Sequence, residues 1–191
     1  MKKLILFLLV FLQLPVLPAI ESDVQTAAAP SFSLTALAGL RDFSNGEFRK
    51  IYNGSQPAFS LDLGYRLGNK FDIFFSGQHL SANGELTFSK ETTSFRLISL
   101  EAGARLVLSM GRFVPFAGAG AGYYLIREEN VIATIDEKKA GFFALGGLRF
   151  RFSEQLFAAV QVKFVSLKLD PFNKTVDLGG WFVGGGIGVM F

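Results

Sequence analysis

Hydrophobic and polar residues alternate along most of this chain, and the alternation is most regular over residues 59 to 67. Leu61 and Leu63 fall on one face of that segment, whereas Asp62 and Arg66 fall on the other. Because successive side chains of a β-strand point to opposite sides, the pattern predicts a strand with one apolar face and one polar face. The sequence therefore favours β-structure in which each strand separates two unlike environments.

About eight such segments follow one another after residue 30, and each reaches the roughly 9–11 residues that a tilted strand needs to cross a membrane. The predicted strands cover residues 32–40, 59–67, 71–80, 98–108, 113–125, 142–151, 156–164 and 181–191. The short links between them span residues 67–71, 109–112 and 152–155. The long, polar links span residues 41–56, 81–93, 127–139 and 167–174.

Short turns at one end of a barrel and long loops at the other are typical of bacterial outer-membrane proteins, whose turns face the periplasm. An even number of strands brings both ends of the mature chain to that same periplasmic side. The sequence therefore predicts an all-β fold, an eight-stranded antiparallel up-and-down transmembrane β-barrel with short periplasmic turns and longer extracellular loops. The predicted location is the outer membrane of a bacterium.

The first residues predict a secretory signal peptide rather than a membrane helix. Lys2 and Lys3 precede an apolar run from Leu4 to Leu17, which is too short for a stable membrane-spanning helix. The predicted signal peptide covers residues 1–19, and small residues offer a second cleavage site as far as residue 29. The rest of the chain, residues 30–191, is then a single outer-membrane barrel domain.

The composition supports a membrane barrel and argues against several other classes of protein. Half of the residues are hydrophobic (50%), with 22 Phe, yet no long apolar run follows the signal peptide. The chain contains no cysteine, which excludes a disulfide-stapled secreted fold and a lipoprotein. The formal net charge of +3 includes Lys2 and Lys3, so the mature domain is close to neutral and no nucleic-acid partner is expected.

The chain ends on an alternating strand whose apolar face includes Ile187, Val189 and Phe191. This ending resembles the C-terminal strand by which bacterial outer-membrane proteins are recognised for assembly. The resemblance implies that these three residues form an assembly signal and that the barrel assembly machinery is a partner. Residues 113–124 and 141–152 are similar to strands of the small OmpA-like outer-membrane barrel domains. That family includes adhesins, envelope stabilisers, narrow pores and a few lipid A enzymes, so the resemblance implies the architecture and leaves the role open.

Charged residues on the polar faces point into the predicted barrel. An eight-stranded barrel is only wide enough for side chains to fill it, and an unpaired buried charge is very unfavourable. The sequence therefore predicts an ion-pair network that plugs the lumen, with Asp62 and Glu101 near the level of Lys163 and above Arg105. The predicted network comprises Asp62, Arg66, Asp72, Glu101, Arg105, Arg149, Arg151 and Lys163. The alternative is a narrow pore for small solutes, lined by the same residues.

Four phenylalanines also fall on the nominal inner face: Phe74, Phe143, Phe157 and Phe182. They fit a polar lumen less well than the charges do. Two explanations stay open at this point. The rings cap the lumen, or a β-bulge shifts the local phase and turns them outward.

One motif suggests catalysis. His79-Leu-Ser81, followed by Asn83, resembles the His-x-Ser-Asn motif of outer-membrane lipid A deacylases, in which an imidazole activates a serine. Ala82 interrupts the motif, the pair lies early in the chain, and no outward carboxylate partner is evident. A deacylase-like hydrolase using His79 and Ser81 is therefore the enzymatic alternative. The leading interpretation has no catalytic, cofactor or metal site.

The expected partners follow from location. Outer-membrane lipid and lipopolysaccharide surround such a barrel, and its long loops face outward. The loop over residues 41–56 mixes basic and aromatic side chains, which suits an extracellular protein or glycan partner. Those residues are Arg41, Phe43, Phe48, Arg49, Lys50 and Tyr52. The sequence therefore predicts a structural or surface-interaction role.

Overall fold

The computed structural model describes residues 32–86, 91–130, 134–169 and 176–191. The predicted signal peptide, residues 1–19 or as far as residue 29, lies outside the described residues. Within these ranges, no helix is long and apolar enough to span a membrane.

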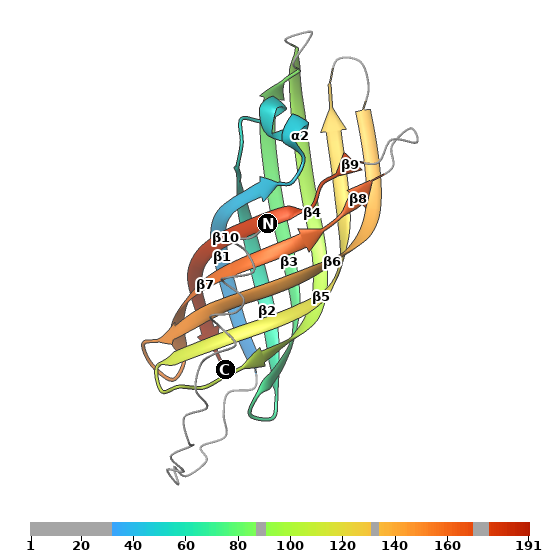
Figure 1. Cartoon of the computed structure of the whole chain (residues 1–191). Helices are drawn as coiled ribbons and strands as arrows, with labels where there is room; N and C mark the ends of the chain where they lie inside the picture. Colours follow the sequence, from blue (N-terminus) through green and yellow to red (C-terminus); the bar gives the residue numbers. More distant parts are fainter. Residues whose placement is uncertain (1–31, 87–90, 131–133, 170–175) are drawn as a thin grey trace, which may run out of the picture.

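Eight strands close into a barrel in which chain neighbours pair in antiparallel fashion and β1 pairs with β10 (Figure 1). The barrel strands are β1 (Phe32–Phe43), β2 (Gln56–Leu67), β3 (Phe71–Glu85), β4 (Thr92–Val107), β5 (Phe113–Glu129), β6 (Thr134–Arg151), β7 (Leu156–Ser166) and β10 (Gly180–Met190). The other elements are helix α2 (Gly46–Ile51) and a small sheet of β8 (Lys168–Leu169) and β9 (Val176–Asp177). The predicted eight-stranded antiparallel barrel is confirmed.

The two ends of the barrel differ in the length of their connections. Tight turns follow Leu67, Val107 and Arg151, and we call this the short-turn end. Gly68 and Gly111 have φ values of 65° and 63° there, a left-handed conformation that glycine adopts without strain. At the opposite end, here called the hairpin end, the β3–β4 and β5–β6 pairs project furthest and α2 lies beside them (Figure 1).

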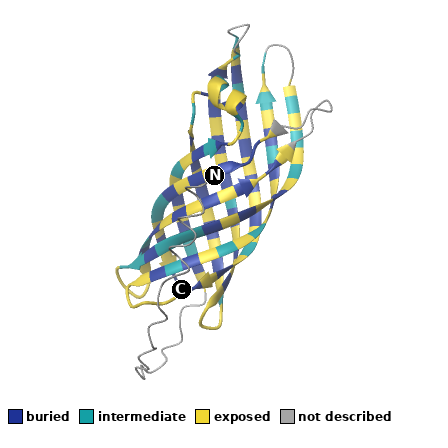
Figure 2. Ribbon diagram, in the orientation of Figure 1, coloured by how far each residue is buried: buried dark blue, intermediate teal, exposed yellow. Residues whose placement is uncertain are grey.

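Exposed and buried residues alternate along every barrel strand, as the banding in Figure 2 shows. In β2, the apolar Leu61 is 54% exposed, whereas the neighbouring Asp62 is only 3% exposed. A water-soluble domain places such residues the other way round. The apolar face therefore points outward and the polar face points into the barrel, in the phase predicted from the sequence.

The four inward phenylalanines keep this phase, so no bulge turns them outward. Phe74, Phe143, Phe157 and Phe182 are each at most 4% exposed. Inward glycines make room for the rings, since a Cβ atom on Gly120 would lie 2.6 Å from the Phe143 ring. Phe143 and Phe182 also flank the Lys163 ammonium, 5.8 and 5.7 Å from their ring centroids. The lumen thus contains rings and charges packed together.

The predicted long loops are shorter than the sequence analysis gave them. Most of residues 81–93 and 127–139 belong to strands, because β3 runs to Glu85 and β4 begins at Thr92, while β5 runs to Glu129 and β6 begins at Thr134. Residues 41–56 contain the end of β1 and all of α2. The described residues of 127–139 are polar because both faces of the β5–β6 hairpin are at least partly exposed there, and polarity alone made them resemble a loop. Residues 170–174 of the fourth predicted loop lie outside the described residues.

The barrel closes where the first and last strands meet. The Phe32 amide donates to the Phe191 carbonyl at 2.9 Å, and the Phe191 amide donates to the Phe32 carbonyl at 3.0 Å. Their rings stack with centroids 6.0 Å apart, and Phe32 also contacts Tyr65. Phe191 therefore completes both the hydrogen-bonded seam and an aromatic cluster at the short-turn end.

Deleting Phe191, or replacing it with Asp, should impair assembly into the outer membrane while leaving export intact, because the seam loses its last hydrogen bonds or its ring. The measurement is the amount of folded, heat-modifiable protein in the membrane fraction. Phe152→Asp is the control, since Phe152 is also exposed but lies outside the seam. Assembly of the Phe191 variants at the wild-type level would contradict the terminal-strand argument.

Candidate functional site

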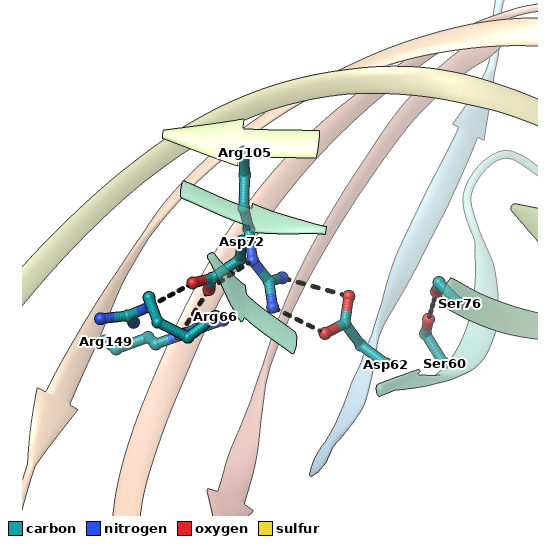
Figure 3. Close-up of polar contacts among 7 residues, drawn as sticks. All are labelled: Ser60, Asp62, Arg66, Asp72, Ser76, Arg105 and Arg149. Atoms are coloured by element: carbon teal, nitrogen blue, oxygen red, sulfur yellow. Dashed lines mark hydrogen bonds and ion pairs between the residues drawn. The ribbon is translucent and has the colours of Figure 1, made fainter. Parts of the chain in front are cut away.

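The lumen near the short-turn end contains a cluster centred on the Arg105 guanidinium (Figure 3). Its NH1 and NH2 groups donate to the two carboxylate oxygens of Asp62 at 3.2 and 3.1 Å. Its Nε donates to Asp72 Oδ2 at 3.2 Å. None of the three side chains is more than 4% exposed. Bidentate pairing of this kind is the strongest arrangement that arginine and carboxylate form.

Asp72 gathers two further cations around the same carboxylate (Figure 3). Arg149 NH1 donates to its Oδ2 at 3.3 Å, and Arg66 Nε donates to its Oδ1. Two carboxylates therefore serve three guanidinium groups. Aromatic ring faces stabilise part of the positive charge that the two carboxylates do not balance. The Arg105 guanidinium lies 4.9 Å from the Phe74 ring centroid, and the Arg149 guanidinium lies 5.2 Å from the Phe157 ring centroid.

A second cluster is built around Glu101. Lys163 Nζ donates to Glu101 Oε2 at 2.6 Å, and the hydroxyls of Ser99 and Tyr124 both donate to Oε1 at 3.1 Å. All four residues are buried. Each oxygen of this carboxylate therefore has a donor, as a buried charge requires.

The structure brings seven of the eight predicted lumen residues into ion pairs, but as two clusters rather than one network. Asp62 pairs with Arg105, while Lys163 pairs only with Glu101 among the described residues. Register explains the division, because Asp72 lies directly opposite Arg66 on β2 and Arg105 on β4. Arg151, the eighth, is half-buried and makes no ion pair within the described part of the chain.

Arg41 is a buried lumen residue that the sequence analysis placed in a loop. Its side chain is 0% exposed and donates to Gln78 Oε1 at 3.1 Å and to the Leu178 carbonyl at 3.4 Å. Its guanidinium carbon also lies 5.2 Å from the Phe43 ring centroid. A signal was present, since Arg41 continues the inward alternation of Thr35 and Leu37 along β1.

Four aromatic side chains pack together at the hairpin end, next to Arg41 through Phe43, and we call them the aromatic cap: Phe43, Phe48, Tyr52 and Phe95. Asn45 positions two of them, because its side chain accepts from the amides of Glu47 and Phe48 and starts helix α2. None of the four rings is more than 8% exposed. Of the residues expected to form a partner-binding loop, Phe43, Phe48, Tyr52 and Arg41 are therefore buried, whereas Arg49 and Lys50 remain exposed.

A hydrogen bond ties the cap to the projecting hairpins. The Tyr52 hydroxyl donates to Glu128 Oε1 at 3.0 Å and lies 3.2 Å from the Thr93 hydroxyl. Burial raises the pKa of Tyr52, so the phenol stays protonated and remains a donor. The cap is therefore fixed to β4 and β5 at both neutral and mildly alkaline pH.

Little space is left between these groups. A cavity of about 10 Å³ lies beside Asp62, Arg105 and Arg149, and it is large enough for about one water molecule. No group of three or more potential metal ligands occurs in the described ranges. The arrangement holds its charges in buried ion pairs, with room for little water beside Asp62 and Arg149.

Comparison with known proteins assigns the family. Residues 6–191 match the model of the outer membrane protein beta-barrel domain. The chain belongs to that family. Its members are barrels of the bacterial outer membrane, which places this barrel in that membrane. No curated protein matches the chain.

Solved structures of outer-membrane barrels share the fold. Neisserial surface protein A is 18% identical, with a TM-score of 0.62 over 84% of this chain and 97% of the other. OprG from Pseudomonas aeruginosa is 13% identical, with a TM-score of 0.69 over 88% and 99%. Ail of Yersinia pestis, solved with the heparin analogue sucrose octasulfate, is 15% identical, with a TM-score of 0.52 over 83% and 96%. At these identities, the likeness concerns the fold alone.

The lipid A deacylase alternative depends on His79 and Ser81, which both lie on the outer wall of this outer-membrane barrel. They are exposed on β3, one outward position apart. That spacing separates their Cα atoms by about 7 Å. Among the described residues, no hydrogen bond joins His79 to Ser81 or to a carboxylate. The phase agrees with the sequence-based expectation, and the contacts of a catalytic triad are not formed.

Asp72→Ala should lower the free energy of unfolding by about 3–5 kcal/mol, because three guanidinium groups lose a shared buried carboxylate. Asp42→Ala is the matched control. Its ion pair with Arg49 is 3.2 Å long but largely exposed, so the expected loss is about 0–1 kcal/mol. Denaturant titration in lipid vesicles measures both. Equal effects of the two substitutions would show that the lumen cluster is solvated.

Proposed function

We propose that this outer-membrane barrel is a sealed scaffold that supports the bacterial envelope and presents its long hairpins at the cell surface. The short-turn end faces the periplasm in this proposal, and the hairpin end faces outward. The observation that carries it is the filled lumen, in which buried ion pairs leave a cavity of only about 10 Å³.

The same observation disfavours a pore for small solutes. A solute path requires continuous water, whereas buried ion pairs join strands on different sides of the lumen. Arg149 of β6 donates to Asp72 of β3, and Lys163 of β7 donates to Glu101 of β4. Opening the path would separate buried ion pairs, and each charge left without its partner would destabilise the barrel by roughly 3–5 kcal/mol. The aromatic cap adds a second barrier at the hairpin end.

The proposed surface role rests on the hairpins that project beyond the cap. Exposed residues on the β5–β6 hairpin and on α2 include both bases and acids, such as Glu129, Arg49 and Lys50. Mixed charge of this kind suits a protein or glycan partner. Ail, which shares the fold, has been solved with a sulfated saccharide analogue, and this supports a glycan as one partner class. The barrel assembly machinery is the second proposed partner, through Ile187, Val189 and Phe191, and lipopolysaccharide and outer-membrane lipid are the third.

The wild-type protein should show no steady conductance in planar lipid bilayers. Glu101→Ala leaves the Lys163 ammonium buried without its carboxylate, so this variant should unfold at a lower temperature or admit water and conduct. Glu129→Ala is the control, because Glu129 is exposed and its loss should change neither property. Large, steady conductance of the wild type would replace the sealed scaffold with a pore.

The proposal is non-enzymatic, and lipid A mass spectrometry tests it. Strains that carry the wild type, a gene deletion, His79→Ala or Ser81→Ala should yield lipid A with the same number of acyl chains. The opposite outcome is an acyl chain missing in the wild type and present in the other three strains. That result would establish a deacylase.

A further inference from the structure

An apolar groove of about 620 Å³ runs across the outer wall of the barrel from β2 to β6. Its floor is low because small outward residues lie at the centre, namely Gly77, Ala102, Ala121 and Ala140. Leu61, Leu100 and Tyr123 are larger and form its sides. In an outer-membrane barrel this surface faces the acyl chains of the membrane, so the groove fits an extended hydrocarbon chain.

Polar residues begin where the groove ends toward the hairpins. His79 is the next outward residue after Gly77 on β3, and Lys138 is the next before Ala140 on β6. Register places both in one row across the wall, through the pairs His79–Ile98 and Leu125–Lys138. The following row contains Arg96 on β4, opposite Arg127 on β5.

Some of the cations at this border already form ion pairs within the protein, and others do not. Arg127 is within ion-pair distance of Glu129 and Asp136. Arg96 and Lys138 are exposed and form no ion pair with any described residue. Strand spacing and rise put their Cα atoms roughly 12 Å apart, a distance that two long cationic side chains can span around one headgroup.

We propose that this groove and its border bind one anionic, phosphate-bearing lipid of the outer leaflet. An acyl chain occupies the groove, and Arg96 and Lys138 bind the headgroup phosphate while His79 lies at the junction. The inference rests on the outer-membrane location and on the proposed orientation with the hairpin end outward, and it does not depend on whether the lumen is sealed. It assigns to His79 a place at a lipid site rather than in a triad.

Charge decides between this groove and a larger one of about 880 Å³ that includes Ala38, Gly146 and Gly185. Toward the hairpin end, the larger groove is bordered by a row containing Asp42, Trp181 and Phe164. That row includes a carboxylate, and the cation beside it, Arg49, is already paired with this carboxylate at 3.2 Å. Of the two grooves, the one on β2 to β6 therefore has the border that complements an anionic headgroup.

Lipid retention by the purified barrel tests the headgroup contact. Native mass spectrometry from non-ionic detergent counts bound phosphatidylglycerol and phosphatidylcholine with identical chains. The wild type should retain phosphatidylglycerol preferentially. The double variant Arg96→Gln with Lys138→Gln should lose about 30-fold in that affinity, since each basic residue near an anionic surface contributes roughly a factor of 5. The control pair, Lys70→Gln with Arg112→Gln, removes the same charge at the short-turn end and should retain the preference.

Filling the groove tests the chain contact. A Cβ atom on Gly77 would meet only the Ser99 carbonyl, at 3.9 Å, so Gly77→Leu fits the fold and fills the groove. Gly146→Leu does the same in the larger groove, where the nearest atom is the Phe116 carbonyl at 3.7 Å. Gly77→Leu should release the lipid and Gly146→Leu should not, with heat-modifiable migration reporting that both fold.

Three results would overturn the site. The first is equal retention of phosphatidylglycerol and phosphatidylcholine by the wild type. The second is an equal loss of phosphatidylglycerol affinity in the border double variant and the control double variant. The third is equal lipid retention by the Gly77→Leu and Gly146→Leu variants. None of these results concerns conductance, so the proposed sealed scaffold is tested separately, by the bilayer measurement.

Discussion

Charged side chains inside a closed eight-stranded barrel must find partners inside it, and this constraint organises the molecule. The outer wall is apolar because it faces lipid, so the polar residues of every strand point into a space that side chains nearly fill. Water cannot solvate a charge there. Arg105 meets this requirement with two carboxylates, and Glu101 meets it with an ammonium and two hydroxyls.

Aromatic rings stabilise the positive charge that the carboxylates do not balance, and glycines leave space for these rings. Cations outnumber anions in the cluster around Asp72, and the guanidinium groups of Arg105 and Arg149 lie over the faces of Phe74, Phe116 and Phe157. The inward phenylalanines are therefore part of the charge arrangement as well as of the packing. Inward glycines beside them leave room for the rings, since a Cβ atom on Gly147 would lie 2.5 Å from the Phe116 ring.

Alternation along the sequence was sufficient to predict the strands, the inward phase of Asp62 and Glu101, and the closure at Phe191. It could not predict which charges pair, because pairing depends on register and on distances across the lumen. Lys163 pairs with Glu101 although the two residues are 62 positions apart. Arg41 was missed because a polar stretch after it resembled a loop, although its own position kept the inward phase. The aromatic cap could not be predicted either, because Phe48 and Tyr52 meet Phe95 of β4 only in the folded chain.

Proton exchange at the Arg105 Nε–H group tests the central claim most directly. NMR of the barrel in lipid nanodiscs can follow this signal, with the exposed Arg96 and Arg112 as internal references. A buried pair that costs about 3–5 kcal/mol to break should slow exchange by at least about 100-fold relative to those references. Protection of that size is the result that a dry, ion-paired lumen predicts. Exchange of Arg105 at the rate of Arg96 would mean that water enters the lumen freely, and would contradict the account.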